Sequence, residues 1–257
     1  MNPSGEQHEL RFGDQRAVVV EVGGGLRSYD GVVDGYAENE MCLSGRGQVL
    51  APWPNRLAGG AYEFDGETHQ LALSEPKSGS AIHGLVRWAN WRAVERDEAH
   101  VVMEYVLHPQ PGYPFTLQLR VEYRLGADGL SVRTTAGNLG NRACPFGVGH
   151  HPYIAAPTGR VDDLLLDGEL LGPKQLDDAY PIDAPWRMRV GDVTVWADAA
   201  WKHVQLFTGD TKPDVARRSI AVEPMTCPPN AFATGEDLIR LEPGDVFEGR
   251  WGISVSG

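Results

Sequence analysis

The sequence predicts an all-β protein, built as a sandwich of large antiparallel sheets, and three observations support this class. Apolar and polar residues alternate with a period of two wherever a period can be recognised. Turn-forming residues separate the alternating segments at close intervals. The 31 Gly and 18 Pro among 257 residues are too many breakers for long helices, and no apolar stripe of helical period extends over three turns. Packed antiparallel sheets account for all three.

The clearest strand covers residues 117–125. Its apolar side chains fall on one face and its polar side chains on the other, which is the pattern of a half-buried strand. Further strands are predicted where β-branched and aromatic residues suit a pleated surface, at residues 17–22, 101–107, 130–134, 203–207 and 220–222.

Two turn sequences predict hairpins, because Asp-Gly pairs tolerate the positive φ angles that tight turns require. One is Asp65-Gly66, and the other is Gly-Ala-Asp-Gly at residues 126–129. The Gly triplet at residues 23–25 predicts a bulge or tight turn after the first strand, and it lacks the spacing of a nucleotide-binding loop.

The chain reads as one domain over residues 1–257, since no repeat or linker-like composition divides it. Residues 162–185 are rich in Asp, Leu, Gly and Pro. Long ordered excursions from a sandwich often line a binding cleft, so we expect this segment to do so.

Charge and composition restrict the partners. The formal net charge is −12 and no basic run is present, so the electrostatic field repels nucleic acid and anionic membranes. We expect a small-molecule partner, with the oligomeric state open between monomer and homodimer. The beginning of the sequence has no signal-peptide pattern, and no apolar run is long enough to cross a membrane. Cys42, Cys144 and Cys227 form no C-x-x-C pair, which favours buried free thiols and a cytoplasmic location.

Polar residues that are able to bind a ligand or transfer a proton occur in short segments rich in Pro, Gly and aromatic residues. Four such segments stand out: residues 52–56 (Pro-Trp-Pro-Asn-Arg), 81–84 (Ala-Ile-His-Gly), 149–153 (Gly-His-His-Pro-Tyr) and 222–230, which begins Val-Glu-Pro-Met-Thr. They contribute the guanidinium of Arg56, the imidazoles of His83 and His151, and the carboxylate of Glu223.

Each of these residues also has a simpler interpretation. Taken alone, Arg56 fits a surface ion pair and each histidine fits a structural role. Glu223 follows the apolar run at 220–222 and precedes Pro224, so it is predicted at a strand end. A surface carboxylate and a partly buried one with a shifted pKa are both open there.

The set is more informative than its members. An imidazole can act as an acid at neutral pH, and a carboxylate can act as a base if its surroundings raise its pKa. Opening a hemiacetal ring needs such a pair, one group for the anomeric hydroxyl and one for the ring oxygen. No cofactor is needed for this chemistry. No metal site is expected either, since no H-E-x-x-H is present and the adjacent His150 and His151 would point to opposite faces of a strand.

The order of these segments and the residues in each of them resemble the aldose 1-epimerase (galactose mutarotase-like) family over residues 18–252. The flanking residues 59–66, 85–88 and 241–245 extend the resemblance. It implies a large antiparallel supersandwich and an isomerase that interconverts the α and β anomers of a free sugar. The motifs Gly-His-His-Pro-Tyr and Glu-Pro-Met-Thr are similar to those of a bacterial branch related to sulfoquinovose mutarotases.

The resemblance implies a role for each matching position. Arg56, with Asn55 beside it, hydrogen-bonds sugar hydroxyls. His83 contacts the sugar near the reacting centre. His151 donates the proton to the ring oxygen, and Glu223 accepts the proton of the anomeric hydroxyl.

Two further positions follow from the resemblance. Tyr153, the aromatic residue of the His-x-Tyr motif, is expected among the substrate-binding residues. A short Asp-x-x-aromatic motif places another sugar-binding carboxylate at Asp177, with Asp178 and Asp183 as close alternatives.

Other functions remain to be weighed against an epimerase of neutral aldoses. A non-catalytic carbohydrate-binding sandwich would not need an acid–base pair, and a glycoside hydrolase would need two carboxylates. An epimerase of an acidic or phosphorylated hexose is a third alternative, since Arg56 or Arg87 could face the cleft. The absence of a Lys/Arg cluster near the motifs favours neutral aldoses.

Overall fold

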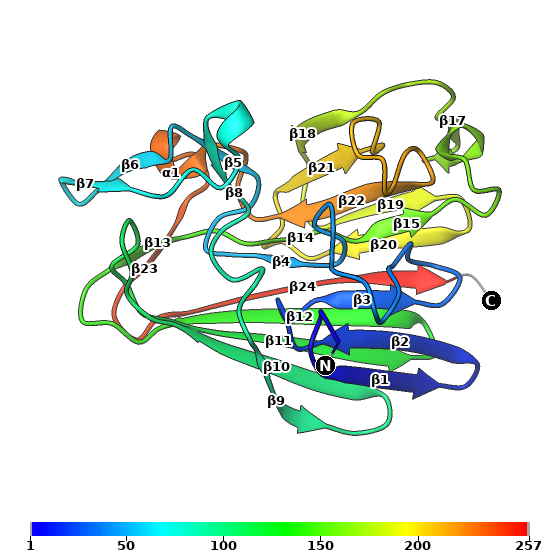
Figure 1. Cartoon of the computed structure of the whole chain (residues 1–257), viewed down its shortest axis with the longest axis horizontal. Helices are drawn as coiled ribbons and strands as arrows, with labels where there is room; N and C mark the ends of the chain where they lie inside the picture. The colour runs from blue at the N-terminus through cyan, green and yellow to red at the C-terminus, as the bar shows by residue number, and fades with distance from the viewer. Residues whose placement is uncertain (1, 256–257) are drawn as a thin grey trace.

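The computed structural model describes residues 2–255 and confirms the all-β class (Figure 1). Every pair of named strands in it is antiparallel, and strands form two large layers with the apolar core between them. The first layer is a nine-stranded sheet. Its order is β17 (Glu169–Leu170), β16 (Leu165–Leu166), β19 (Trp186–Val190), β20 (Val193–Ala197), β24 (Val246–Val255), β12 (Gly129–Asn138), β11 (Leu117–Gly126), β10 (His100–Leu107) and β9 (Arg92–Arg96).

The second layer carries the motifs. Its six-stranded sheet has the order β18 (Asp177–Pro181), β21 (His203–Phe207), β22 (Ser219–Met225), β14 (Gly149–His150) and β4 (Val49–Leu50), with β15 (Tyr153–Ala155) also paired to β22. A three-stranded sheet of β1 (Gln7–Phe12), β2 (Gln15–Val20) and β3 (Leu26–Tyr29) joins it through Val33, which bridges Tyr29 and Ile154.

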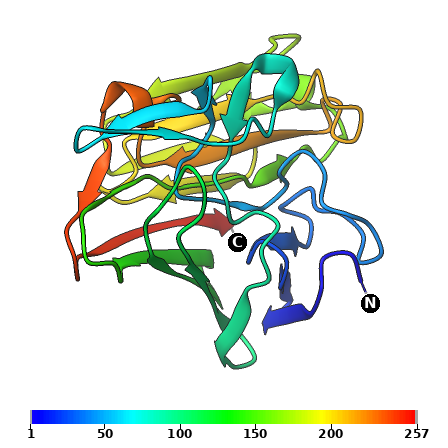
Figure 2. The same cartoon turned by 60° about the vertical axis from the view of Figure 1, so that its left-hand side comes forward.

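Short pairs and helical turns cover the ends of the sheets. They are β5 (Arg56–Ala58) with β8 (Ser80–Ile82), β6 (Ala61–Phe64) with β7 (Glu67–Gln70), β13 (Cys144–Phe146) with β23 (Ile239–Leu241), and the single turns η1 (Pro76–Ser78), η2 (Val161–Asp163) and α1 (Ala231–Thr234). Both views place the β5–β8 segment beside the ends of β21 and β22 (Figures 1 and 2). No helix within residues 2–255 is long and apolar enough to span a membrane.

The predicted strands all form, with small differences at their ends. The apolar face of β11 is buried along its whole length, as its period of two predicts. Residues 203–207 coincide with β21, whereas the strand predicted at 17–22 ends at Val20. It ends early because the Gly triplet already turns the chain, and the N–H of Val20 donates to the carbonyl of Gly25 across that turn.

Both predicted hairpins are confirmed. Asp65 and Gly66 have φ angles of 51° and 78° and connect β6 to β7. Residues 126–129 connect β11 to β12, and Gly129 has a φ of 111°. The three cysteines are buried free thiols, as expected.

The position predicted for Glu223 is wrong. It does not end a strand: β22 continues to Met225, and Glu223 pairs with Gln205 of β21. The strand tolerates Pro224 because, on the opposite side, pairing with β15 ends at Ala221 and pairing with β14 is at Met225. Glu223 therefore lies inside a central strand and is 2% exposed.

Residues 162–185 contribute little to the cavity that collects the motifs. Three short strands of this segment, β16, β17 and β18, extend the edges of the two large sheets. Strand pairing satisfies the backbone there, so the segment is a part of the sheets rather than a free loop. Only Asp177, the first residue of β18, contributes to the cavity described below.

Candidate active site

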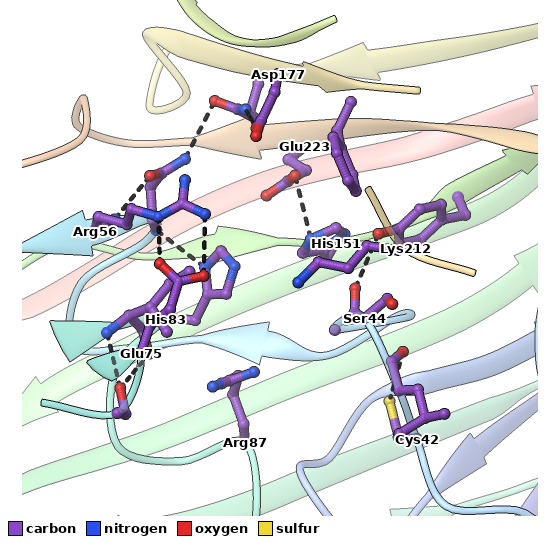
Figure 3. A pocket seen from close by; sticks show the side chains of 18 of the residues that line it. Cys42, Ser44, Arg56, Glu75, His83, Arg87, His151, Asp177, Lys212 and Glu223 are labelled. Atoms are coloured by element: carbon purple, nitrogen blue, oxygen red, sulfur yellow. Dashed lines mark hydrogen bonds and ion pairs between the residues drawn. The ribbon is translucent and has the colours of Figure 1, made fainter. Parts of the chain in front are cut away.

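A cavity of about 570 Å³ collects side chains from all four motifs (Figure 3). Its floor comes from β21 and β22, and its walls come from loops that are distant in sequence. The lining residues are Met41, Cys42, Leu43, Ser44, Gly45, Asn55, Arg56, Ser74, Glu75, Ile82, His83, Arg87, Trp88, His151, Tyr153, Asp177, Gln205, Phe207, Thr211, Lys212 and Glu223. All seven residues predicted for the site are among them.

Glu223 and His151 face each other on the floor of the cavity. The Oε1 atom of Glu223 lies 3.3 Å from Nε2 of His151, and both side chains are at least 95% buried. The Oε2 atom of Glu223 has no hydrogen-bond partner in the described residues. Burial, together with the carboxylate of Asp177, raises the pKa of Glu223 well above its ordinary value, although Arg56 opposes the shift.

His151 is held in a fixed orientation. Its ring stacks on Tyr153, with centroids 4.9 Å apart and planes 11° apart. The ring of His83 meets it edge-on at 5.4 Å. Burial and the nearby guanidinium of Arg87 lower the pKa of His151 to about 3, so an isolated imidazole there is neutral at pH 7.

The two adjacent histidines point to opposite faces, as the strand geometry predicts. His150 is buried in the core, where its Nε2 lies 2.8 Å from the hydroxyl of Thr134 and its ring packs on Trp201 and Trp251. His151 points into the cavity. Only the second histidine is therefore available to a ligand.

His83 is arranged as a hydrogen-bond donor. Its Nδ1 accepts the backbone N–H of Asn55 at 3.1 Å, which leaves the proton on Nε2. Burial and the neighbouring His151 hold the pKa of His83 well below its ordinary value. The imidazole is therefore neutral and has one N–H to offer to a polar group in the cavity.

Asn55 contributes mainly to the frame of the site. Its Oδ1 accepts the backbone N–H of Arg56, and its Nδ2 donates to Gln205 at 3.2 Å. Gln205 in turn donates to Asp177 at 2.9 Å. This chain of bonds links the first motif to β21 and β18, and it presents the carboxylate of Asp177 at the rim.

Among the three candidate sugar-binding aspartates, only Asp177 reaches the cavity. Asp178 is the next residue of β18, so its side chain points to the other face, and Asp183 lies beyond the strand. Burial raises the pKa of Asp177.

Arg56 forms a close pair with Glu75. The Nε atom lies 2.6 Å from one carboxylate oxygen and Nη2 lies 3.1 Å from the other, a fork geometry that fixes the guanidinium plane. The bond from Arg56 lowers the pKa of Glu75 to about 2, so this carboxylate stays ionised. Arg56 retains N–H groups for a ligand while its charge is largely neutralised.

Both the ring and the hydroxyl of Tyr153 support the site. Its hydroxyl donates to the carbonyl of Ser44 at 2.9 Å, and its ring lies under His151. Tyr153 also lines the cavity, so its expected contact with substrate stays a prediction.

Two cations in the cavity have no carboxylate partner. Within residues 2–255, neither Arg87 nor Lys212 forms an ion pair, and the Arg87 guanidinium donates to Gln48 at 3.5 Å. Burial lowers the pKa of Arg87. The sequence showed no basic cluster near the motifs because Lys212 is distant from them along the chain.

The lining residues that the sequence did not identify include four with polar side chains: Ser44, Glu75, Gln205 and Lys212. Gln205 carried a detectable signal, since it is a polar residue inside the apolar strand 203–207. The other three lie in polar loops and differ in no local way from solvated residues. No group of three or more His, Cys, Asp or Glu in the described part of the chain is arranged to hold a metal ion.

The profile of the family described as aldose 1-epimerase matches residues 6–168, more than half of the chain. The chain belongs to the aldose 1-epimerase family. The Escherichia coli (strain K12) protein YihR, an uncharacterized protein, is 35% identical to this family member over 95% of the chain and 91% of YihR. YphB of the same organism, also uncharacterized, is 27% identical over 51% of the chain and 43% of YphB.

Solved structures of aldose epimerase relatives share the fold. A GalM/aldose epimerase homologue from C. elegans superposes with a TM-score of 0.82, at 14% identity, over 98% of this chain and 99% of that one. A galactose mutarotase-like protein from Clostridium acetobutylicum gives 0.78 at 14% identity, with both chains fully covered. The galactose mutarotase-like sandwich predicted from the sequence is thereby confirmed.

Proposed function

We propose that this member of the aldose 1-epimerase family catalyses the interconversion of the α and β anomers of a free aldose. Glu223 is the base for the anomeric hydroxyl, and His151 is the acid for the ring oxygen. The observation that carries the proposal is the buried carboxylate–imidazole pair, 3.3 Å apart, on the floor of a polar cavity.

The pair is suited to hold a single proton. The pKa of Glu223 is raised and that of His151 is lowered by burial, so each isolated group favours its neutral form. Nevertheless, an ionised Glu223 beside His151 stabilises the imidazolium. The two groups can therefore share one proton, and such coupled groups titrate as a unit.

Ring opening uses the form in which His151 is protonated and Glu223 is ionised. Glu223 removes the proton of the anomeric hydroxyl, whose oxygen becomes the aldehyde oxygen as the bond from C1 to the ring oxygen breaks. His151 delivers its proton to the departing ring oxygen. Rotation about the C1–C2 bond and the reverse transfers form the other anomer, so protons and electrons balance over the cycle.

The remaining polar groups are placed to hold the sugar. The Nε2–H of His83 donates, the carboxylate of Asp177 accepts, and the free N–H groups of Arg56 donate to hydroxyls on the ring. A non-catalytic carbohydrate-binding protein would have no use for a buried carboxylate with an unpartnered oxygen, since such a group is costly to bury.

Magnetisation-exchange NMR between the α and β anomers of a panel of free hexoses and pentoses tests the proposal. We expect the protein to accelerate exchange for at least one aldose above the rate in buffer. Binding of a sugar without any acceleration would contradict the proposal and identify a carbohydrate-binding protein instead.

A second candidate function is epimerisation of an anionic aldose. The observation that favours it is the pair of cations, Arg87 and Lys212, that line the cavity without a carboxylate partner. An anionic group on the sugar would neutralise them. The sequence alone favoured neutral aldoses, because no basic cluster lies near the motifs.

Exchange rates for glucose, glucose 6-phosphate and glucuronate separate the two candidates. A higher kcat/KM for the anionic sugars that is lost in Arg87→Gln supports the second candidate. A preference for glucose that Arg87→Gln leaves unchanged supports the first. Arg92→Gln is the control, because Arg92 is an exposed residue of β9 outside the cavity.

A further inference from the structure

The loop of residues 41–48, named here the His151 loop, holds the backbone of His151. The N–H of Gly47 donates to the carbonyl of His151 at 2.8 Å, and the N–H of His151 donates to the carbonyl of Gln48 at 3.2 Å. The position of His151 along the floor of the cavity therefore depends on this loop.

The same loop also contacts the imidazole. A Cβ atom added to Gly45 would lie 2.9 Å from Cδ2 of His151, so the backbone of Gly45 closes one side of the ring. Tyr153 stacks on the ring, and its hydroxyl donates to the carbonyl of Ser44. The loop therefore contacts both the imidazole and the tyrosine that stacks on it.

One carboxylate fixes the loop from outside. The Oδ1 atom of Asp214 accepts the hydroxyl of Ser44 at 2.7 Å, and Oδ2 lies 2.9 Å from Nη2 of Arg46. The other terminal nitrogen of Arg46 donates to the carbonyl of Gly35 at 2.8 Å. Both oxygens of Asp214 are thus used to attach residues about 170 positions away in the sequence.

These contacts are not those of an ordinary surface ion pair. The side chains of Arg46 and Asp214 are only 8% and 22% exposed. Fully solvated ion pairs, by contrast, contribute little to the stability of a fold. Ser44 also has a φ of 54°, in the left-handed region, which a non-glycine residue adopts only when its surroundings require it. The hydrogen bond from Ser44 to Asp214 is one contact that holds Ser44 in this conformation.

We propose that Asp214 is a positioning residue for His151. By binding Ser44 and Arg46 it fixes the His151 loop, and the loop keeps the imidazole of His151 aligned with Glu223. Asp214 lies in the same turn as Lys212, so the contact also attaches the loop that carries Lys212 to the opposite wall of the cavity. This inference rests on the proposed function only for its kinetic consequence.

Three substitutions test the proposal at increasing distance from the ring. Gly45→Ala places a methyl group against His151, Ser44→Ala removes one bond to Asp214, and Asp214→Asn removes the charge that Arg46 faces. Asp34→Asn is the matched control. Asp34 also binds an arginine and a serine, Arg218 at 3.0 Å and Ser219 at 2.7 Å, but it does not line the cavity.

The first measurement is independent of activity. In protein labelled at histidine, we expect the ring signals of His151, assigned by their loss in His151→Asn, to shift or broaden in all three variants. They should stay unchanged in Asp34→Asn. If Asp214→Asn does not fold, Ser44→Ala decides the result, and Gly45→Ala shows only that the ring signals report a displacement of the loop.

The second measurement is the rate of anomer exchange. We expect kcat to fall about tenfold to a hundredfold in Asp214→Asn, with KM changed less, since misplacing a catalytic group by about 1 Å costs roughly that much. Unchanged His151 signals in Ser44→Ala and Asp214→Asn would overturn the proposal, even if Gly45→Ala shifts them by direct contact. A wild-type protein without exchange activity would refute the proposed function instead, and the ring signals would still test the role of Asp214.

Discussion

Glu223 is the residue on which the proposed chemistry depends most directly. Glu223→Gln keeps the shape and the hydrogen bonding of the side chain but removes the proton acceptor. We expect kcat to fall by about 10²–10⁴, the usual contribution of a positioned base, with little change in KM. Exchange at the wild-type rate would contradict this role, and Asp177 would then be the next base to test, because it is the other predicted carboxylate on the cavity wall.

The same substitution should stabilise the protein. A carboxylate that is 2% exposed, with one oxygen unpartnered, costs free energy in the folded state whenever it is ionised. Because the folded pKa of Glu223 is raised, this cost is complete above the folded pKa. It shrinks as the pH falls from there and vanishes only below the ordinary pKa of an unfolded glutamate. We expect a higher Tm for Glu223→Gln than for wild type at pH 8, and a smaller difference at pH 5. An equal or lower Tm at pH 8 would show that Glu223 is well solvated or paired.

His151 and Glu223 should act as a unit. Both must transfer a proton in one ring opening, so His151→Asn should lower kcat about as much as Glu223→Gln does. The double variant should lose far less than the product of the two single losses. Multiplicative losses, measured by the same anomer-exchange assay, would mean that the two residues act in separate steps.

The pH dependence reports on the proton that the pair shares. Gaining a second proton requires protonation of His151 beside a neutral Glu223, and the pKa of His151 is lowered to about 3. Losing the single proton is governed by the raised pKa of Glu223. The activity should therefore be retained well below pH 6 on the acid side and lost on the alkaline side. An acid limb near pH 6.5 in kcat/KM would instead indicate an unperturbed histidine.

At the scale of elements, the pairing of β21 with β22 builds the floor of the site. The register sets Gln205 directly beside Glu223, and Gln205 joins Asn55 to Asp177 across the cavity. Gln205→Ala should release Asp177 and raise KM about tenfold while kcat changes less, since one hydrogen bond to a charged group contributes on the order of 1.5–3 kcal/mol. An effect on kcat alone would place Gln205 in the chemistry rather than in binding.

Side-chain ion pairs join the loops of the site, in addition to the backbone bonds that some of them make. Arg56 with Glu75, and Arg46 with Asp214, each join segments that a sequence pattern treats as independent. This explains why strand positions were predicted well and loop residues were not. Period-two alternation is a local property, whereas the partner of a loop side chain is decided by the packing of the sheets.

At the scale of the whole molecule, the proposed cycle is complete without a metal or a nucleotide. Glu223 and His151 supply the acid and the base, and the sugar supplies the electrons that move. Exhaustive treatment with EDTA should therefore leave the anomer-exchange rate unchanged. A loss of rate that is restored by a divalent metal would refute the acid–base mechanism.

The sequence by itself determined the sheet class, six of the strands, the buried face of β11, the two hairpins and the residue types of the four motifs. These follow from local period and from turn chemistry, which the order of residues encodes directly. Only the tertiary structure decided that Glu223 is buried inside a strand, that Tyr153 supports His151, and that Glu75, Gln205 and Lys212 share the cavity. The reason is that burial, and with it the pKa of a carboxylate or an imidazole, depends on which distant segments cover the group.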